Sequence, residues 1–139
     1  MAPFTTTRRV EFCHTDAGGI MHFAGYFEMM EQAEHELLRQ LGLSVVMQHE
    51  GQTVSWPRVS AKCDFAKPAR FEDELEIQIG VAKVGKRSVT YAAEFFFSGQ
   101  SIASGELVSV CCVIEPGKPL QSMDIPDEIA EKLVSCKLA

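Results

Sequence analysis

The sequence predicts an α+β fold in which an antiparallel sheet surrounds one long helix. Apolar side chains recur at helical spacing over residues 25–41, and Gly42 stands where a C-terminal helix cap is expected. Before and after this segment, apolar and polar residues alternate with the period of β-strands. With 139 residues and no linker or internal repeat, the chain is expected to form a single domain over residues 1–139.

One strand is expected before the helix and four after it. Residues 5–13 carry Val10, Phe12 and β-branched threonines, which favour a strand. The later strands are expected at residues 54–65, 75–81, 89–97 and 101–114, the last two joined by the turn SGQS. Pro57 predicts a kink or an edge position in the first of these four. A short second helix is expected at residues 125–135, because Pro126 suits a first helical turn.

Composition excludes several classes of function. A formal net charge of -6 argues against nucleic-acid binding, which requires a basic surface. No apolar stretch approaches the roughly 20 residues of a membrane span and the N-terminus lacks a signal-peptide pattern, so a cytoplasmic protein without membrane attachment is expected. The five cysteines form no C-x-x-C pair and no zinc spacing, which predicts reduced thiols; neither a metal nor another cofactor is expected.

The segment HTDAGGIMHFAGYF, residues 14–27, places a carboxylate and two glycines between the first strand and the long helix. In one interpretation Asp16 bonds its own backbone in a turn that the glycines permit. In the other, the glycines bring the backbone close to a ligand, while the helix beginning near Gly25 directs free N–H groups at a developing oxyanion. A carboxylate beside such donors could hydrolyse an acyl compound.

Further side chains of this region also allow two interpretations. His22 suits a structural or a catalytic role, and Tyr26 suits the core or an acyl pocket. At 100° per residue, Glu34 falls inside the apolar arc of the helix, with Glu31 at its border. A buried carboxylate is costly unless it is paired, so Glu34 is expected either to meet a partner or to serve a site.

Taken together, these patterns resemble the hotdog-fold acyl-CoA thioesterases, specifically the 4-hydroxybenzoyl-CoA thioesterase-like family. The resemblance covers nearly the whole chain. The first family motif matches here at Asp16, Gly18, Gly19, His22, Phe23, Tyr26 and Glu31. The later CDFAKPARFEDELEI is similar to the family's strand, proline turn, acidic pair and strand, and GELVSVCCVIEPGKP resembles its final strand and ending. The sequence departs from the common family pattern at His14, often an acid, at Gly25, often Asn or Ser, and at Glu34, often Arg.

The resemblance implies a hotdog fold, in which the sheet wraps around the long helix, and an acyl-CoA thioesterase. It implies that Asp16 is the nucleophile or activates water, with His22 and Glu31 as further catalytic residues. A thiolate leaves easily, so such hydrolysis needs no strong base or metal. The residues expected to bind substrate are Gly19, Phe23, Ala24, Gly25, Tyr26, Glu34, Arg58, Lys86 and Arg87. The family's site lies between subunits, and the wide apolar arc of the helix also favours a homo-oligomer, either a dimer or a tetramer.

The sequence allows alternatives for the phosphate contacts and for the reaction. Lys86 and Arg87 in VGKRS lead the candidates for the phosphates of CoA, followed by Arg58, Lys67 and Arg70, but a solvated hairpin turn explains them equally well. One alternative function is a hotdog hydratase or dehydratase that pairs a histidine with a helix glutamate. The other is a noncatalytic acyl-CoA binding module, which fold similarity does not exclude.

Overall fold

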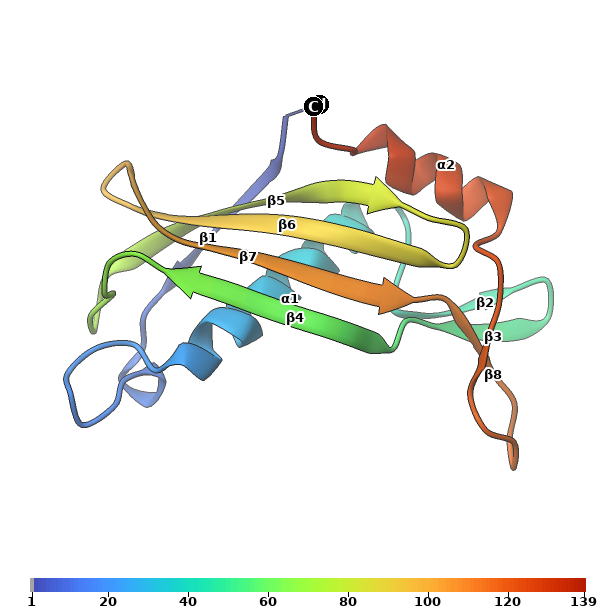
Figure 1. The fold of residues 1–139 in the computed structure, drawn as a ribbon, viewed down its shortest axis with the longest axis horizontal. Helices are drawn as coiled ribbons and strands as arrows, with labels where there is room; N and C mark the ends of the chain where they lie inside the picture. The colour runs from blue at the N-terminus through green and yellow to red at the C-terminus, as the bar shows by residue number, and fades with distance from the viewer. Residues whose placement is uncertain (1) are drawn as a thin grey trace.

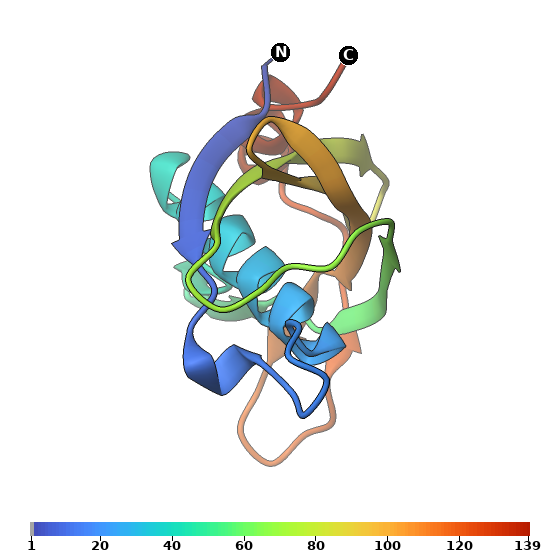
Figure 2. The same ribbon diagram turned by 90° about the vertical axis from the view of Figure 1, so that its left-hand side faces the viewer.

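The computed structural model describes residues 2–139 and has the predicted α+β architecture. Five antiparallel strands form the main sheet in the spatial order β1 (Phe4–Arg9), β5 (Glu74–Val84), β6 (Ser88–Phe97), β7 (Gln100–Val110) and β4 (Arg58–Phe65). Helix α1 (Phe23–Gln40) crosses one face of this sheet (Figure 1). In the end view of Figure 2 the sheet curls around the helix, which is the arrangement that the sequence predicts.

The core lies between α1 and the inner face of the sheet. On β5, Leu75, Ile77 and Ile79 point inward and are fully buried, while the residues between them are partly exposed. From α1, the side chains packed against this face include Met29, Met30, Ala33, Leu37 and Leu38. Gly105 of β7 permits the close approach of the helix, because a Cβ atom there would overlap Met30 and stand 2.9 Å from the backbone oxygen of Lys62.

A second, smaller sheet extends the fold beyond the C-terminal end of α1. It contains β2 (Val46–His49), β3 (Gln52–Ser55), β8 (Cys112–Ile114) and β9 (Gln121–Ser122). The prediction of one strand over residues 54–65 is therefore wrong, whereas the edge position that Pro57 predicted is confirmed for β4. The chain leaves the small sheet before Pro57, which has no N–H group for a strand ladder, and enters the main sheet as β4.

The predicted strand over residues 101–114 is divided in the same way. It breaks at Cys111, whose N–H donates to the carbonyl oxygen of Arg87 at 2.7 Å in continuation of the β6–β7 register, and the next residues form β8. After this residue the chain pairs with β3 rather than with β4. Both chain segments thus change sheets at neighbouring positions, a tertiary feature that period-two alternation does not reveal.

The ends of the other predicted elements differ by a few residues. The first strand ends at Arg9, and residues 12–14 form a short 3-10 helix, η1 (Phe12–His14). Helix α1 begins two residues earlier than predicted, and Gly42 takes the left-handed φ of 75° expected after its C-terminus. The predicted second helix is α2 (Asp127–Ser135), with Pro126 as its N-cap residue. Within residues 2–139, neither helix is long and apolar enough to span a bilayer, and all five cysteines are free thiols.

The contact between α1 and β7 gives a test of the packing. Gly105→Ala should lower the free energy of unfolding by about 1–3 kcal/mol, because the new methyl group would meet Met30 and a backbone oxygen that cannot move freely. Urea unfolding followed by circular dichroism measures this change. Ser104→Ala, on the adjacent residue of the same strand, is the control and should stay within about 0.5 kcal/mol of wild type. Equal stability of both variants would contradict the close helix–sheet contact.

Candidate functional site

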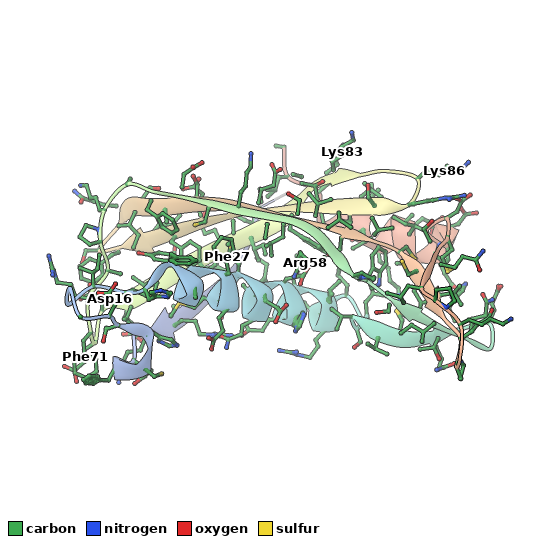
Figure 3. The ribbon with its side chains drawn as sticks, turned by 60° about the horizontal axis from the view of Figure 1, so that its bottom comes forward. Asp16, Phe27, Arg58, Phe71, Lys83 and Lys86 are labelled. Carbon is green, nitrogen blue, oxygen red and sulfur yellow. The ribbon has the colours of Figure 1, made fainter. Side chains whose placement is uncertain are left out.

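An open cavity of about 520 Å³ lies at the N-terminal end of α1. Its lining combines the loop before the helix, the first helical turn, and the last residue of β4 with the segment that follows it. The lining residues are Asp16, Ile20, Met21, His22, Phe23, Tyr26, Phe65, Ala66, Lys67 and Pro68. Figure 3 shows Asp16 at this end of the molecule, with Arg58 near its middle and Lys86 at the opposite end. The structure therefore brings together four of the predicted site residues, namely Asp16, His22, Phe23 and Tyr26.

Asp16 sits in a tight loop that is closed by a bridge between Thr15 and Met21. Its Oδ1 atom accepts the N–H of Gly18 at 2.8 Å, and its backbone N–H donates to Ile20 at 3.0 Å. Gly19 follows with a φ of 76°, which glycine adopts without strain. The turn interpretation is thus confirmed, yet within residues 2–139 the second carboxylate oxygen accepts no hydrogen bond. The same aspartate can stabilise the turn and face the cavity.

The first turn of α1 brings further backbone N–H groups to the same cavity. His22 is the N-cap residue, and its Nδ1 atom accepts the N–H of Ala24 at 3.2 Å. The N–H of Gly25 donates to the carbonyl oxygen of His22 at 2.9 Å, so it is already engaged. Among the described residues the Phe23 N–H makes no hydrogen bond. The available donors are therefore one or two residues earlier than the sequence suggested.

Gly25 was predicted to bind substrate, but in the structure it serves the packing of the helix start. It is buried, and a Cβ atom there would stand 3.1 Å from Cγ of Met21 and 3.7 Å from Cβ of His14. Glycine thus lets the first turn of α1 pack against both ends of the Asp16 loop. The residue fixes where the helix begins relative to the carboxylate, and it does not line the cavity.

Aromatic rings form the wall of the cavity away from the loop. Tyr26 packs edge-to-face with Phe65 at a centroid distance of 4.9 Å, and with Phe95 of the core at 5.2 Å. Burial raises the pKa of the Tyr26 phenol above its ordinary value, so the hydroxyl stays protonated at neutral pH. Phe23 and Phe65 remain about half exposed at the cavity mouth. Large apolar side chains held beside open space favour a ligand with an apolar part.

The contribution of residues 65–68 to the cavity was largely missed in the sequence. Phe65, Ala66, Lys67 and Pro68 line the cavity, although only Lys67 was a candidate, and a secondary one. Its Nζ atom donates to Oε1 of Gln100 at 2.9 Å, which holds the ammonium group near the cavity. The available signal was the family-like segment CDFAKPAR, which contains all four residues. Their contact with the HTDAGG loop depends on sheet topology and leaves no periodic pattern in the sequence.

Glu34 has a partner in the same chain. It is 2% exposed, and its two carboxylate oxygens accept hydrogen bonds from the two terminal nitrogens of Arg58, both at 2.7 Å. Arg58 also donates to the hydroxyl of buried Ser109 at 2.7 Å. The hydrogen bonds that Arg58 donates to Glu34 raise the pKa of Arg58 further above its already high value. The structural interpretation of Glu34 is supported, because its burial is matched by a bidentate ion pair.

Glu31 lies beside this ion pair and outside the Asp16 cavity. Its carboxylate is 3.6 Å from Arg58 and is mostly exposed. Glu31, Glu34 and Arg58 line a separate depression of about 180 Å³, which also contains Trp56. Within one chain, the predicted catalytic Glu31 is therefore not part of the cavity that holds Asp16.

The basic turn VGKRS is also remote from Asp16 within one chain, as Figure 3 shows for Lys86. Arg87 donates through Nε to Asp124 at 2.8 Å, and Lys86 lies 3.8 Å from the same carboxylate. The hydrogen bond from Arg87 keeps the pKa of Asp124 below its usual value. This ion pair supports the structural interpretation of the turn, although both basic side chains remain largely exposed.

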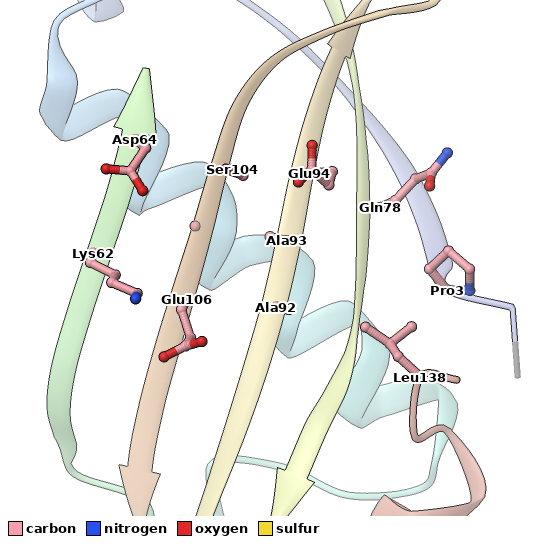
Figure 4. Close-up of a pocket in the computed structure, with 11 residues that line it drawn as sticks. Pro3, Lys62, Asp64, Gln78, Ala92, Ala93, Glu94, Ser104, Glu106 and Leu138 are labelled. Atoms are coloured by element: carbon pink, nitrogen blue, oxygen red, sulfur yellow. The ribbon is translucent and has the colours of Figure 1, made fainter. Parts of the chain in front are cut away.

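Another cavity, of about 380 Å³, lies on the opposite face of the main sheet from α1 (Figure 4). Its polar lining includes Lys62, Asp64, Glu94 and Glu106. Most of the lining residues belong to paired strands, so their backbone N–H groups are engaged in the sheet. The cavity beside Asp16 is the better candidate for acyl chemistry, because it combines a carboxylate with the start of a helix.

A sheet curled around a long helix, with a carboxylate-bearing loop before that helix, defines a protein of the hotdog fold. The sequence of residues 10–133 matches the model of the thioesterase-like superfamily. The match covers most of the chain, which therefore belongs to this superfamily. The predicted resemblance to hotdog thioesterases and the assignment of the chain as a thioesterase enzyme are confirmed.

Individual relatives agree with this assignment. A proposed esterase of Aquifex aeolicus is 31% identical over 132 residues, which cover 94% of this chain and 98% of that protein. A 1,4-dihydroxy-2-naphthoyl-CoA hydrolase of Nostoc punctiforme is 27% identical over 94% of this chain and 86% of its own length. Among solved structures, a gentisyl-coenzyme A thioesterase is 26% identical, with a TM-score of 0.77 and coverage of 91% of this chain and 98% of that one.

The ion pair of the second depression makes a prediction about stability. Glu34→Gln should lower the free energy of unfolding by about 3 kcal/mol, because it leaves the partly buried Arg58 guanidinium without its bidentate counter-charge. Glu31→Gln, the same substitution on the exposed side of the pair, should cost at most about 1 kcal/mol. Chemical denaturation of both variants measures the difference. Equal losses would show that burial of Glu34 does not determine the strength of this contact.

Proposed function

We propose that the chain hydrolyses an acyl-CoA thioester to the free acid and CoA in the Asp16 cavity. The observation that supports this most directly is that one cavity holds an ionisable carboxylate and the N-terminus of an 18-residue helix. The named relatives include hydrolases of acyl-CoA thioesters. A cytoplasmic location fits such a substrate and remains a prediction.

Asp16 would act in one of two ways. As a nucleophile, its carboxylate attacks the thioester carbonyl carbon, the carbon–sulfur bond breaks, and CoA leaves as a thiolate; water then hydrolyses the mixed anhydride. As a general base, Asp16 takes a proton from a water molecule, and the resulting hydroxide attacks the same carbon and expels the thiolate. Both routes consume one water molecule and yield the acid and CoA.

The helix start would stabilise the negative charge on the thioester oxygen. Its unengaged Phe23 N–H and its weakly bonded Ala24 N–H are the candidate donors. Rotation of His22 would release Ala24, which gives that side chain a role in opening the oxyanion site. Donors of this kind act where charge develops in the transition state, so they lower the barrier more than they strengthen substrate binding.

We infer that a second copy of the chain completes the site. Strand β4 pairs with β7 on one side only, and Val59 and Phe65 on it are 59% and 49% exposed. Such an edge strand is a template for pairing with another chain. Two β4 strands joined by a two-fold axis run antiparallel, so the Phe65 end of one would meet the Arg58 end of the other.

This pairing would place the Asp16 cavity of one copy next to the Arg58 depression of its partner. In this arrangement Glu31, Glu34 and Arg58 of one subunit would belong to the same site as Asp16 of the other. It would also bring the end of the partner that bears Lys86 and Arg87 toward the cavity (Figure 3). Contact of these two basic residues with CoA phosphates is proposed only in such an oligomer.

Asp16→Asn tests the proposed chemistry. Asparagine keeps the oxygen that accepts the Gly18 N–H, so the turn, the oligomer and the melting temperature should be preserved. It can act neither as nucleophile nor as base, so kcat should fall by roughly 10²-fold or more. The assay is chromatographic detection of CoA released from aromatic and straight-chain acyl-CoAs, which avoids background from the protein thiols.

A folded Asp16→Asn protein with near-wild-type turnover would sink this mechanism. Hydration of an enoyl-CoA without CoA release would favour the hydratase alternative. Binding of acyl-CoA without any turnover by the wild-type protein would favour the noncatalytic module.

The oligomer is tested by light scattering at micromolar protein concentration. The expected mass is two or four times the chain mass of 15.4 kDa, because the unpaired edge of β4 and its apolar side chains favour self-association. A stable monomer with full activity would contradict a site shared between subunits.

A further inference from the structure

His14 lies at the base of the Asp16 loop and joins its two ends. Its backbone carbonyl oxygen accepts the N–H of His22 at 2.7 Å, which closes the loop just outside the Thr15–Met21 bridge. Its own N–H donates to the carbonyl oxygen of Glu11 at 3.0 Å. The position of Asp16, two residues further along, therefore depends on how His14 is held.

His14 is the last residue of η1, and its imidazole ring makes further contacts. Nδ1 accepts the backbone N–H of Glu11 at 2.9 Å, and Nε2 lies 4.0 Å from the Glu28 carboxylate of α1. The side chain is 16% exposed, although Phe12, Cys13 and Asp16 around it are exposed. On its other side, the His14 Cβ atom is 3.7 Å from where a Gly25 Cβ would stand. The ring thus lies between η1 and the first turns of α1.

We propose that His14 is a positioning residue, which holds the Asp16 carboxylate at the correct distance from the N-terminus of α1. This inference rests on the proposed function, because it assigns to His14 the geometry that thioester hydrolysis would use. Nδ1 accepts the Glu11 N–H, so this atom carries no proton in the hydrogen-bonded loop. A small displacement of a reacting group is enough to lower turnover, even when the substrate still binds.

Two substitutions separate the acceptor from the rest of the side chain. In His14→Asn, the side-chain oxygen occupies about the position of Nδ1 and can accept the Glu11 N–H. In His14→Leu, similar bulk remains but no acceptor does. His49→Leu is the matched control, because His49 is 14% exposed, also faces glutamate carboxylates, and belongs to β2.

The expected result is a loss of kcat without a comparable change in KM. His14→Leu should lower kcat for acyl-CoA by about 10²-fold while KM changes little, because misplacement of Asp16 affects the transition state more than binding. His14→Asn should keep kcat close to wild type, and so should His49→Leu. Amide hydrogen exchange at Gly18 and Gly19 should be faster in His14→Leu alone, since both N–H groups bond to Asp16 in the native loop.

The inference is overturned if His14→Leu retains wild-type kcat, or if folded His14→Asn loses as much activity as His14→Leu. If His14→Leu fails to fold, the kcat of His14→Asn decides between these outcomes by itself. Failure of the proposed function is recognised separately. If the proposed function is wrong, Asp16→Asn keeps its turnover. If only the role of His14 is wrong, Asp16→Asn is inactive and the His14 variants alone depart from the expected result.

Discussion

Helix α1 and the inner face of the five-stranded sheet each carry an apolar surface, and each covers the other. At Gly105 the absence of a side chain leaves room for Met30 of the helix against the sheet. Burying the polar group of Glu34 in this interface is tolerated because Arg58 of β4 meets it with two hydrogen bonds. Both contacts lie in the middle of the helix, one turn apart.

Packing of α1 on the sheet leaves the N-terminus of the helix at the cavity that contains Asp16. Backbone N–H groups there have no partners within the helix, and their partial positive charge attracts an anion. The HTDAGG loop brings a carboxylate to the same place and uses one of its oxygens to stabilise its own turn. Structural and catalytic interpretations of Asp16 therefore do not exclude one another, since a carboxylate that is held in place is better suited to chemistry.

Periodic patterns in the sequence were sufficient for most of the architecture. The long helix, the strands of residues 75–81 and 89–97, and the buried place of Glu34 follow from spacing alone, and the structure contains all of them. Two of the errors fall at Pro57 and Cys111, where the chain passes from one sheet to the other; the short strands β2 and β9 were also not predicted. Alternation has the same period in both sheets, so it cannot show which strand will be the neighbour.

The candidate site was predicted in part for the same reason. Asp16, His22, Phe23 and Tyr26 are close in sequence, and they line one cavity. Phe65 and Lys67 join them only because β4 ends beside the start of α1, which depends on the topology of the sheet. Glu31 and Lys86 lie elsewhere in a single chain, and their predicted roles now depend on a second copy.

The central claim is that the N-terminus of α1 polarises a thioester carbonyl held beside Asp16. Isotope-edited infrared spectroscopy measures this directly, with a carbonyl-labelled aromatic acyl-CoA bound to Asp16→Asn so that the thioester remains intact. Phe23→Pro removes the free N–H from a helix position that tolerates proline, and Phe23→Ala is its control for the lost ring. The carbonyl band should move to lower frequency on binding to Asp16→Asn, and the shift should be smaller with Phe23→Pro than with Phe23→Ala. A bound thioester whose carbonyl band stays at its frequency in water would contradict the claim.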